Sequence, residues 1–195
     1  AVVKELAEHM GIIWDVAEQG QIAQTLQLHN LAETFFKRQL EPNSFAIDYL
    51  FSRGLDKQMI AKFALGYAPD SWDALLNFTR NGMGFFNRDL FSESGLFSSN
   101  ERGKVFDRFR QRIIFPIHNH RNQVIAFGGR VLNDSDKTAK YLNSPDSPLF
   151  EKGRVLYNLN RVAANDRVRE VIVVEGYMDV IALDQFGINN VVAPL

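Results

Sequence analysis

The 195-residue sequence has no cysteine, which excludes disulfide bonds and thiolate metal sites within this chain. It also has no apolar run of membrane-spanning length, and its first residues lack the basic start and apolar core of a signal peptide. With 46% hydrophobic residues there is ample material for a core. We therefore expect a soluble globular protein without a membrane association, suited to the reducing conditions of the cytoplasm.

The chain has almost no net charge, but its charges are unevenly distributed. The formal total is -1. Residues 1–50 contain three Lys/Arg against seven Asp/Glu, whereas residues 101–130 contain seven Lys/Arg against two Asp/Glu. Binding of polyanions depends on where the positive charge lies more than on its total. The middle of the chain is therefore a candidate surface for a polyanion.

Short helices are predicted for the first half of the sequence. Apolar residues recur at helical spacing, and Asn, Ser and Asp residues stand where helices begin. A polar stretch at 18–24 is expected to be a linker that runs into the second helix. The predicted helices are residues 3–10, 23–40, 45–52, 56–62 and 72–81. The two tryptophans and most phenylalanines are assigned to the core.

After residue 103 the pattern changes from helix to strand. Residues 112–117 and 123–127 predict two strands around a polar turn that contains His118 and His120. Pro116 indicates an edge position or the end of a strand. The glycine pair at 128–129 is expected to end the second strand, residues 133–150 to form a loop, and residues 154–164 to form a turn or short helix.

A strand that ends in an acidic residue lies close to the C-terminal end. The β-branched run 171–174 predicts a strand buried on both faces, as in a parallel sheet. Glu175 follows at its carboxyl end, where open α/β sheets bind their ligands. A helix over 177–185, a cap at Gly187 and a second strand from Asn190 complete a βαβ unit.

Glu175 and Asp179 are therefore candidates for chemistry. A carboxylate beside an apolar strand is costly unless it is paired or solvated. Glu175 could bind a hard cation such as Mg²⁺ or accept a proton near one. The alternative is an acid that caps the start of a helix, and this interpretation suits Asp179 better than Glu175.

Several cationic motifs are candidates for phosphate binding. Arg108, Arg110 and Arg112 alternate, so an extended chain would place them on one face. Arg130 follows the glycine pair. The segment from Lys140 combines a cation, an aromatic ring and an amide, which can anchor a phosphate, stack on a base and hydrogen-bond. Tyr141, Asn143 and Lys152 also belong to this group of motifs. For each motif the alternative is a solvated strand edge or a polar loop.

In their order along the chain these segments resemble the bacterial replicative, DnaG-type DNA primases. The last segment is similar to the first acidic motif of the Toprim fold, the α/β module that primases share with topoisomerases. Residues 49–55 and 63–68 are similar to the same family. The resemblance rests on four segments: FDRFRQRIIFPI (106–117), VIAFGGR (124–130), KYLNSP (140–145) and VVEGYMD (173–179).

The resemblance implies an α+β fold in two parts. Residues 16–168 would form a helix-rich amino-terminal subdomain with a small antiparallel sheet. Residues 169–195 would be the first βαβ unit of a Toprim fold. Residues 1–15 would be the end of a linker from a zinc-binding module, which is where the family binds zinc. Further aspartates of the Toprim metal site, including an Asp-x-Asp pair, are expected beyond Leu195.

The resemblance also implies synthesis of short RNA primers on a single-stranded DNA template from ribonucleoside triphosphates, with Mg²⁺ or Mn²⁺. A replicative helicase and a single-stranded DNA-binding protein would be partners of the full-length protein. Glu175 would be the essential acid at the metal site, supported by Asp179. The phosphate-binding ridge would comprise Arg53, Arg130, Lys140, Tyr141, Asn143 and Lys152, with Arg108, Arg110 and Arg112 beside it.

Two other functions remain open at this point. One is a different Toprim enzyme, a topoisomerase or a nuclease, although a topoisomerase also needs a nucleophilic tyrosine on another domain. The segments at Arg130 and Lys140 argue against both enzymes. The other is a single-stranded DNA-binding module without chemistry. Because part of the metal site is missing, we expect residues 1–195 alone to have little or no primer synthesis activity.

Overall fold

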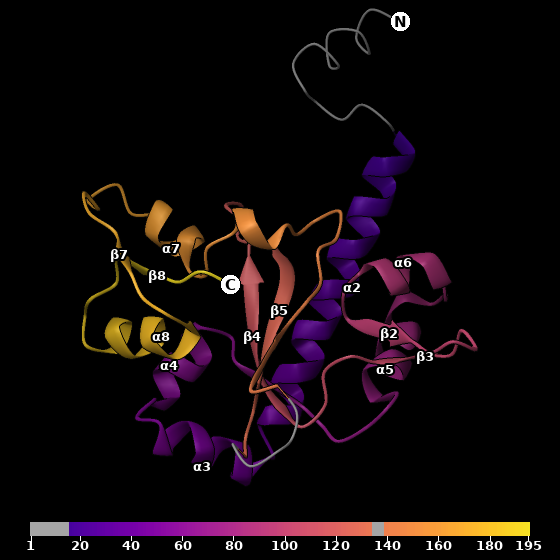
Figure 1. The fold of residues 1–195 in the computed structure, drawn as a ribbon, viewed down its shortest axis with the longest axis horizontal. Helices are drawn as coiled ribbons and strands as arrows, with labels where there is room; N and C mark the ends of the chain where they lie inside the picture. The colour runs from indigo at the N-terminus through magenta and orange to yellow at the C-terminus, as the bar shows by residue number, and fades with distance from the viewer. Residues whose placement is uncertain (1–15, 134–138) are drawn as a thin grey trace, which may run out of the picture.

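A computed structural model describes residues 16–133 and 139–195 (Figure 1). The predicted helix at 3–10, the linker at 1–15 and Trp14 lie outside these residues. Within the described residues, no helix is both long enough and apolar enough to cross a bilayer.

Helices surround a four-stranded antiparallel sheet, which confirms the expected α+β fold. The sheet has the order β1-β4-β5-β6, while β2 pairs with β3, and β7 pairs in parallel with β8. The helices are α2 (Val16–Leu40), α3 (Ser44–Ser52), α4 (Lys57–Lys62), α5 (Ala74–Met83), α6 (Arg88–Glu93), α7 (Leu159–Ala163) and α8 (Tyr177–Gln185), with a 3₁₀ turn η1 (Lys152–Arg154). The strands are β1 (Gly66–Ala68), β2 (Phe97–Ser99), β3 (Val105–Asp107), β4 (Arg112–His118), β5 (Val124–Val131), β6 (Tyr141–Asn143), β7 (Ile172–Val173) and β8 (Val191–Val192).

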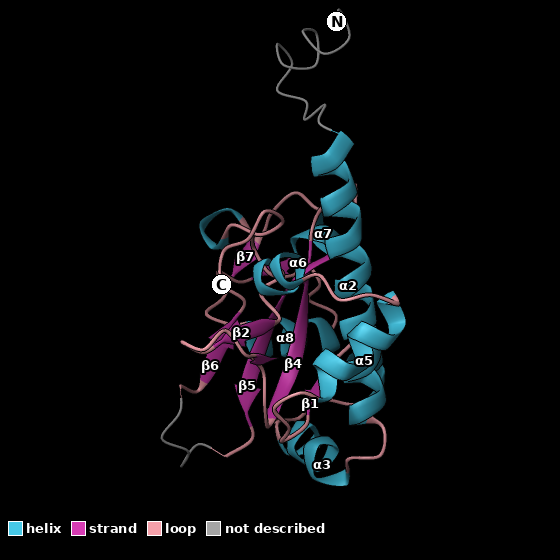
Figure 2. Ribbon diagram, turned by 90° about the vertical axis from the view of Figure 1, so that its right-hand side faces the viewer, coloured by secondary structure: helices cyan, strands magenta, loops and turns pink. Residues whose placement is uncertain are grey.

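Both faces of the sheet are buried, which explains why β4 and β5 read as continuous apolar runs. On one face, Ile114 and Phe127 pack with Phe36 of α2. On the other, Ile113 and Phe115 pack with residues of α3, α4 and α8. Figure 1 shows α2 to the right of β4 and β5 and α8 to their left. Figure 2 shows β6, β5, β4 and β1 from left to right across the sheet.

The helix α2 is longer than the sequence predicts. It begins at Val16, so the polar stretch that we assigned to a linker is helical. Most side chains of residues 19–24 are exposed, because this end of α2 extends beyond the sheet (Figure 1). A helix without an apolar face carries no periodic signal, which explains the wrong prediction.

Two glycines lie within β5 instead of ending it. A Cβ on Gly128 would lie 2.5 Å from the hydroxyl oxygen of Tyr177, and one on Gly129 would lie 2.8 Å from Cδ1 of Phe109. Each glycine therefore makes room for an aromatic side chain. Pro116 is tolerated in β4 because β1 pairs with that strand only at residues 112–114.

The strand β1 was not predicted from the sequence, and β6 lies within the segment that was predicted to be a loop. Each has only three residues, too few to establish a period of two, and each forms by pairing with a longer strand. Other predictions are confirmed: α3 and α4 begin after Asn43 and Asp56, and α8 covers the predicted residues 177–185.

The burial predicted for 171–174 is wrong in this structure. Val171, Ile172 and Val173 are 48%, 41% and 66% exposed, respectively. Within the described residues β7 pairs only with β8. A strand in a two-stranded pair has an unpaired edge, so its apolar sequence does not guarantee burial.

The helix α5 begins at Ala74, two residues later than predicted, and its start is fixed by a residue of β3. The buried carboxylate of Asp107 accepts hydrogen bonds from the backbone N–H groups of Leu75 and Leu76 at 2.8 and 2.9 Å. The N–H of Asp107 also donates to the carbonyl oxygen of Trp72 at 2.8 Å. Trp72 therefore precedes the helix and is 59% exposed, which corrects its assignment to the core.

His118, the last residue of β4, generates a prediction about pH. Burial, together with the nearby charge of Arg161, lowers the pKa of His118 from 6.5 to about 4. The unfolded chain therefore binds a proton near pH 6.5 that the folded chain binds only near pH 4. The free energy of unfolding should fall as pH is lowered through this window.

We expect His118→Gln to reduce this loss of stability between pH 7 and pH 5 by on the order of 1 kcal/mol, as measured by denaturant unfolding. The exposed His120, in the turn that follows β4, provides the control. His120→Gln should leave the pH dependence of the parent protein unchanged. Equal pH slopes for His118→Gln and the parent would contradict the prediction.

Candidate functional site

An open hollow of about 450 Å³ brings together residues from distant parts of the chain. It receives side chains from the end of α3, from β5 and β6, and from the start of α8. Six of the eleven residues that the sequence analysis selected line this hollow. The lining residues are Arg53, Arg130, Lys140, Tyr141, Glu175, Gly176, Met178, Asp179 and Ala182.

The acidic side of the hollow lies where β7 leads into α8. Gly176 is the N-cap of α8, Glu175 precedes it, and Asp179 lies in the first turn of the helix. Both carboxylates are exposed, and the partial positive charge of the helix start favours them. Oxygen ligands of this kind suit Mg²⁺ or Mn²⁺. Among residues 16–133 and 139–195, however, no three His, Cys, Asp or Glu side chains form a potential metal site.

The basic side is organised around Arg130, whose guanidinium group lies between two tyrosines. Its Nε donates a hydrogen bond to the hydroxyl of Tyr49, and its Nη1 donates to the hydroxyl of Tyr141. Its Cζ lies 5.9 Å from the ring centroid of Tyr49 and 5.1 Å from that of Tyr141. Burial acts to lower the pKa of Arg130, but the hydrogen bonds and charges of the two tyrosines outweigh it and raise the pKa.

Arg53 adds a second guanidinium group to this arrangement. It is the C-cap of α3, and its Cζ lies 5.2 Å from the ring centroid of Tyr49, one helical turn earlier. We refer to Arg53, Tyr49, Arg130 and Tyr141 as the cation–tyrosine ladder. Cations that contact aromatic rings keep their charge while their positions are restricted. Tyr49 was not assigned a role from the sequence, although its spacing of four residues from Arg53 was the available signal.

Tyr177, at the start of α8, joins the acidic side to the sheet. Its ring stacks on Phe115 at 4.9 Å between centroids and meets the edge of Tyr157 at 4.7 Å. Its hydroxyl donates to the side-chain oxygen of Asn143 at 2.7 Å. Asn143 pairs in register with Gly128. Because Gly128 has no Cβ, it leaves room for the Tyr177 hydroxyl. Asn143 therefore contributes to the hollow indirectly, by holding Tyr177. Burial raises the pKa of Tyr177 far above its ordinary value.

The three alternating arginines do not share one face, which corrects the prediction of an extended segment. Residues 108–111 lie outside any strand, and Gln111 turns the chain with a φ of 49°. Arg108 donates to the backbone oxygen of Asn143 at 3.2 Å. Arg112 is buried and donates to the backbone oxygen of Ala139 at 2.9 Å. These two arginines therefore hold the segment that carries Lys140 and Tyr141.

Arg110 instead lies at the surface. Its Cζ is 3.7 Å from the ring centroid of the exposed Trp72, and its Nη1 donates to the backbone oxygen of Asp107 at 2.9 Å. Sequence reasoning missed Trp72, because a lone tryptophan is more often a core residue. Lys152 lies in the exposed turn η1 and does not line the hollow.

The contact of Gly128 with Tyr177 generates a prediction about the site. Gly128→Ala places a methyl group 2.5 Å from the Tyr177 hydroxyl, and such overpacking costs about 1–3 kcal/mol. We expect a loss of this size in the free energy of unfolding and a displaced Tyr177 side chain, measured by denaturant titration and tyrosine NMR signals. Gly153→Ala is the matched control, because a Cβ there meets nothing within 4 Å. A stable Gly128→Ala protein with unshifted Tyr177 signals would refute the prediction.

The comparisons with known proteins agree on one family. Residues 35–163 match the family described as the DNA primase catalytic core, N-terminal domain, and residues 169–195 match a Toprim domain. A DNA primase of Clostridium acetobutylicum is 46% identical over 164 residues, which cover 84% of this chain and 27% of the relative. A DNA primase of Escherichia coli is 46% identical over 176 residues, which cover 88% of this chain and 30% of the relative.

Solved structures give the same answer. A DnaG primase catalytic domain bound to single-stranded DNA matches with a TM-score of 0.82 and 43% identity, covering 91% of this chain and 57% of that one. The zinc-binding and RNA polymerase domains of the Aquifex aeolicus primase match with a TM-score of 0.81 and 35% identity, covering 99% and 47%.

The chain spans about a third of the length of the curated relatives. The chain belongs to the bacterial DNA primase family, and its residues correspond to the N-terminal domain of the catalytic core and the start of the Toprim domain.

Proposed function

We propose that this chain supplies the nucleotide- and template-binding part of a DNA primase, which synthesises short RNA primers on single-stranded DNA from ribonucleoside triphosphates. The observation that carries the proposal is the hollow, where the cation–tyrosine ladder and Lys140 meet Glu175 and Asp179. Residues 16–168 would be the binding subdomain and residues 169–195 the start of the Toprim domain, with 1–15 as a linker from a zinc-binding module.

The arrangement suits phosphoryl transfer, which depends on positioning and on charge stabilisation more than on covalent chemistry by the protein. Arg53, Arg130 and Lys140 would bind the phosphates of the incoming nucleotide. Glu175, with Asp179, would hold part of a Mg²⁺ or Mn²⁺ site, whose other ligands would come from outside the described residues. When bound, the metal would neutralise charge on the reacting phosphate.

The template would approach over the surface that carries Trp72 and Arg110. A primase catalytic domain similar to this chain has been solved with single-stranded DNA bound. An exposed aromatic ring can stack on a base of any sequence, and the neighbouring guanidinium group can contact a phosphate. Lys152, on the exposed turn η1, would add a further phosphate contact. A replicative helicase and a single-stranded DNA-binding protein would be partners of the full-length protein in the bacterial cytoplasm.

The second candidate function is binding of single-stranded DNA without chemistry. It is favoured by the absence of a complete metal site among residues 16–133 and 139–195. It does not require Glu175, so this residue separates the two functions. The same incomplete site leads us to expect little or no templated RNA synthesis by residues 1–195 alone.

The role of Glu175 can be tested in the full-length protein. We expect Glu175→Gln to lower the rate of primer synthesis at least about a hundredfold, because losing a metal ligand removes several kcal/mol of transition-state stabilisation. Binding of single-stranded DNA should change less than about twofold, since phosphate contacts supply most of that affinity. Both are measured on one preparation, by labelled-nucleotide incorporation and fluorescence anisotropy.

Glu170→Gln is the control for the Glu175 variant. Glu170 is also exposed and lies just before the same strand, but it does not line the hollow. Its substitution removes the same charge and should leave synthesis unchanged. Full activity of the Glu175→Gln protein would reject a catalytic role and favour the DNA-binding module.

The template surface provides a separate test. Trp72→Ala should weaken binding of an oligothymidine strand by about 1–3 kcal/mol, the usual contribution of one base stacked on an aromatic ring. Trp72→Phe should keep most of the affinity, because the ring remains. Phe45→Ala, which removes another strongly exposed ring, is the control and should have no effect. Equal affinities for Trp72→Ala and the parent would remove Trp72 from the template path.

A further inference from the structure

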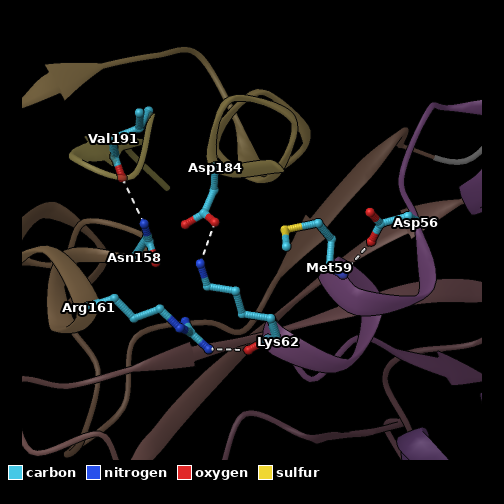
Figure 3. Close-up of polar contacts among 7 residues, drawn as sticks. All are labelled: Asp56, Met59, Lys62, Asn158, Arg161, Asp184 and Val191. Carbon is cyan, nitrogen blue, oxygen red and sulfur yellow. Dashed lines mark hydrogen bonds and ion pairs between the residues drawn. The ribbon is translucent and has the colours of Figure 1, made fainter. Parts of the chain in front are cut away.

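The turn that carries Arg53 is held from a distant part of the chain. Arg53 ends α3, Gly54 follows in a left-handed conformation with a φ of 86°, and Asp56 starts α4. The side chain of Asp56 caps α4 by accepting from the N–H of Met59 at 2.8 Å (Figure 3). Arg53, Gly54 and Asp56 are exposed, and Leu55 is the one residue of this turn that is buried in the core.

Gln185, the last residue of α8, binds both sides of this turn. Its Nε2 donates to the backbone oxygen of Gly54 at 2.9 Å, and its Oε1 accepts from the backbone N–H of Asp56 at 2.9 Å. An amide side chain can do this in one orientation only, with its donor toward the carbonyl and its acceptor toward the N–H. The pair of bonds therefore fixes both the side chain and the turn.

The neighbouring residue fixes the helix itself. Asp184 is buried and accepts a hydrogen bond from Lys62 at the end of α4 (Figure 3). The carbonyl oxygen of Lys62 in turn accepts from Arg161 at 2.7 Å. The end of α8 is therefore anchored to α4 beside the point where Gln185 contacts the turn, so Gln185 is not a freely moving surface side chain.

The same helix also carries the acidic side of the hollow. Met178, Asp179 and Ala182 of α8 line it, and Gln185 follows Ala182 by three residues, close to one helical turn. One rigid element thus joins the carboxylates at its start to the Arg53 turn at its end.

We propose that Gln185 is a positioning residue that keeps the Arg53 guanidinium group at the hollow. The inference rests on the proposed function, in which Arg53 binds nucleotide phosphate. Gln185 does not line the hollow, so its effect on the ligand passes through the 53–56 turn.

The test compares four forms of the full-length protein: the parent, Gln185→Ala, Arg53→Ala and the double variant. Affinity for ATP with Mg²⁺ is measured by calorimetry. Because the two lost hydrogen bonds hold the turn and not the ligand, only part of their free energy should reach ATP binding, and we expect a roughly three- to tenfold weaker affinity for Gln185→Ala. If Gln185 acts through Arg53, its substitution should cause less than about a twofold further loss in the Arg53→Ala background, because effects that share one path are not additive.

Two controls separate positioning from general loosening. Asn190→Ala removes a similar bond from a side chain to a backbone oxygen, that of Glu170 at 2.8 Å, and should leave ATP affinity unchanged. Gln185→Glu keeps the acceptor for the Asp56 N–H but loses the donor to Gly54, so its ATP affinity should lie between those of the parent and Gln185→Ala.

Hydrogen exchange provides a measurement without ligand. The amide of Asp56 should exchange faster in Gln185→Ala than in the parent, while amides of β4 and β5 keep their rates. Unchanged exchange at Asp56, or equal effects of Gln185→Ala with and without Arg53, would overturn the inference. If Arg53→Ala left ATP affinity unchanged, the proposed role of Arg53 in binding phosphate would be rejected. This result would be distinct from the hydrogen-exchange result, because faster exchange at Asp56 would still show that Gln185 holds the turn.

Discussion

The packing of Tyr177 against the sheet is the constraint on which the hollow depends. The ring fits because Gly128 has no Cβ, and its hydroxyl is satisfied by Asn143 on the next strand. Each of these three residues stands two positions from a residue that lines the hollow: Glu175, Arg130 and Tyr141, respectively. On β5 and β6, residues two apart point to the same face, and Tyr177 and Glu175 lie on either side of the N-cap of α8. The relative positions of Glu175, Arg130 and Tyr141 are therefore determined by core packing, and not by contacts among these polar groups themselves.

The cation–tyrosine ladder shows how a nearly neutral protein maintains a concentrated positive charge. Arg53 and Arg130 repel each other electrostatically, and the ring of Tyr49 lies against both of them. The tyrosine hydroxyls accept hydrogen bonds from Arg130, which phenylalanines in the same places could not do. The cost of removing this guanidinium group from water is thereby offset. Much of the ordering needed to bind a phosphate is already complete before the ligand arrives.

Sequence reasoning selected six of the residues that line the hollow, but it described their surroundings less well. The acid after the β-branched run and the helix over 177–185 could be predicted because strand and helix periods are local properties. The strands β1 and β6 could not be predicted, since three-residue strands exist only through their partners. The Gly128–Gly129 pair was mistaken for the end of the strand because the need for space comes from Tyr177 and Phe109, which are distant in sequence. The direction of Arg108 and Arg112 likewise depends on backbone oxygens that only the fold brings near.

The length of α8 sets the separation between the acidic side of the hollow and the turn that carries Arg53. Glu175 precedes the helix and Gln185 is its last residue. The nine residues of α8 therefore determine how far the Glu175 carboxylate lies from the Gln185 amide that binds the Arg53 turn. A helix rises about 1.5 Å and turns about 100° with each residue. Adding or removing a single residue would rotate the Gln185 amide away from Gly54 and Asp56, and a full extra turn would restore its direction but carry it about 5.4 Å past them. The separation between Glu175 and the Gln185 contact with the Arg53 turn is thus set by the number of residues in one short helix, which tolerates substitutions more easily than insertions.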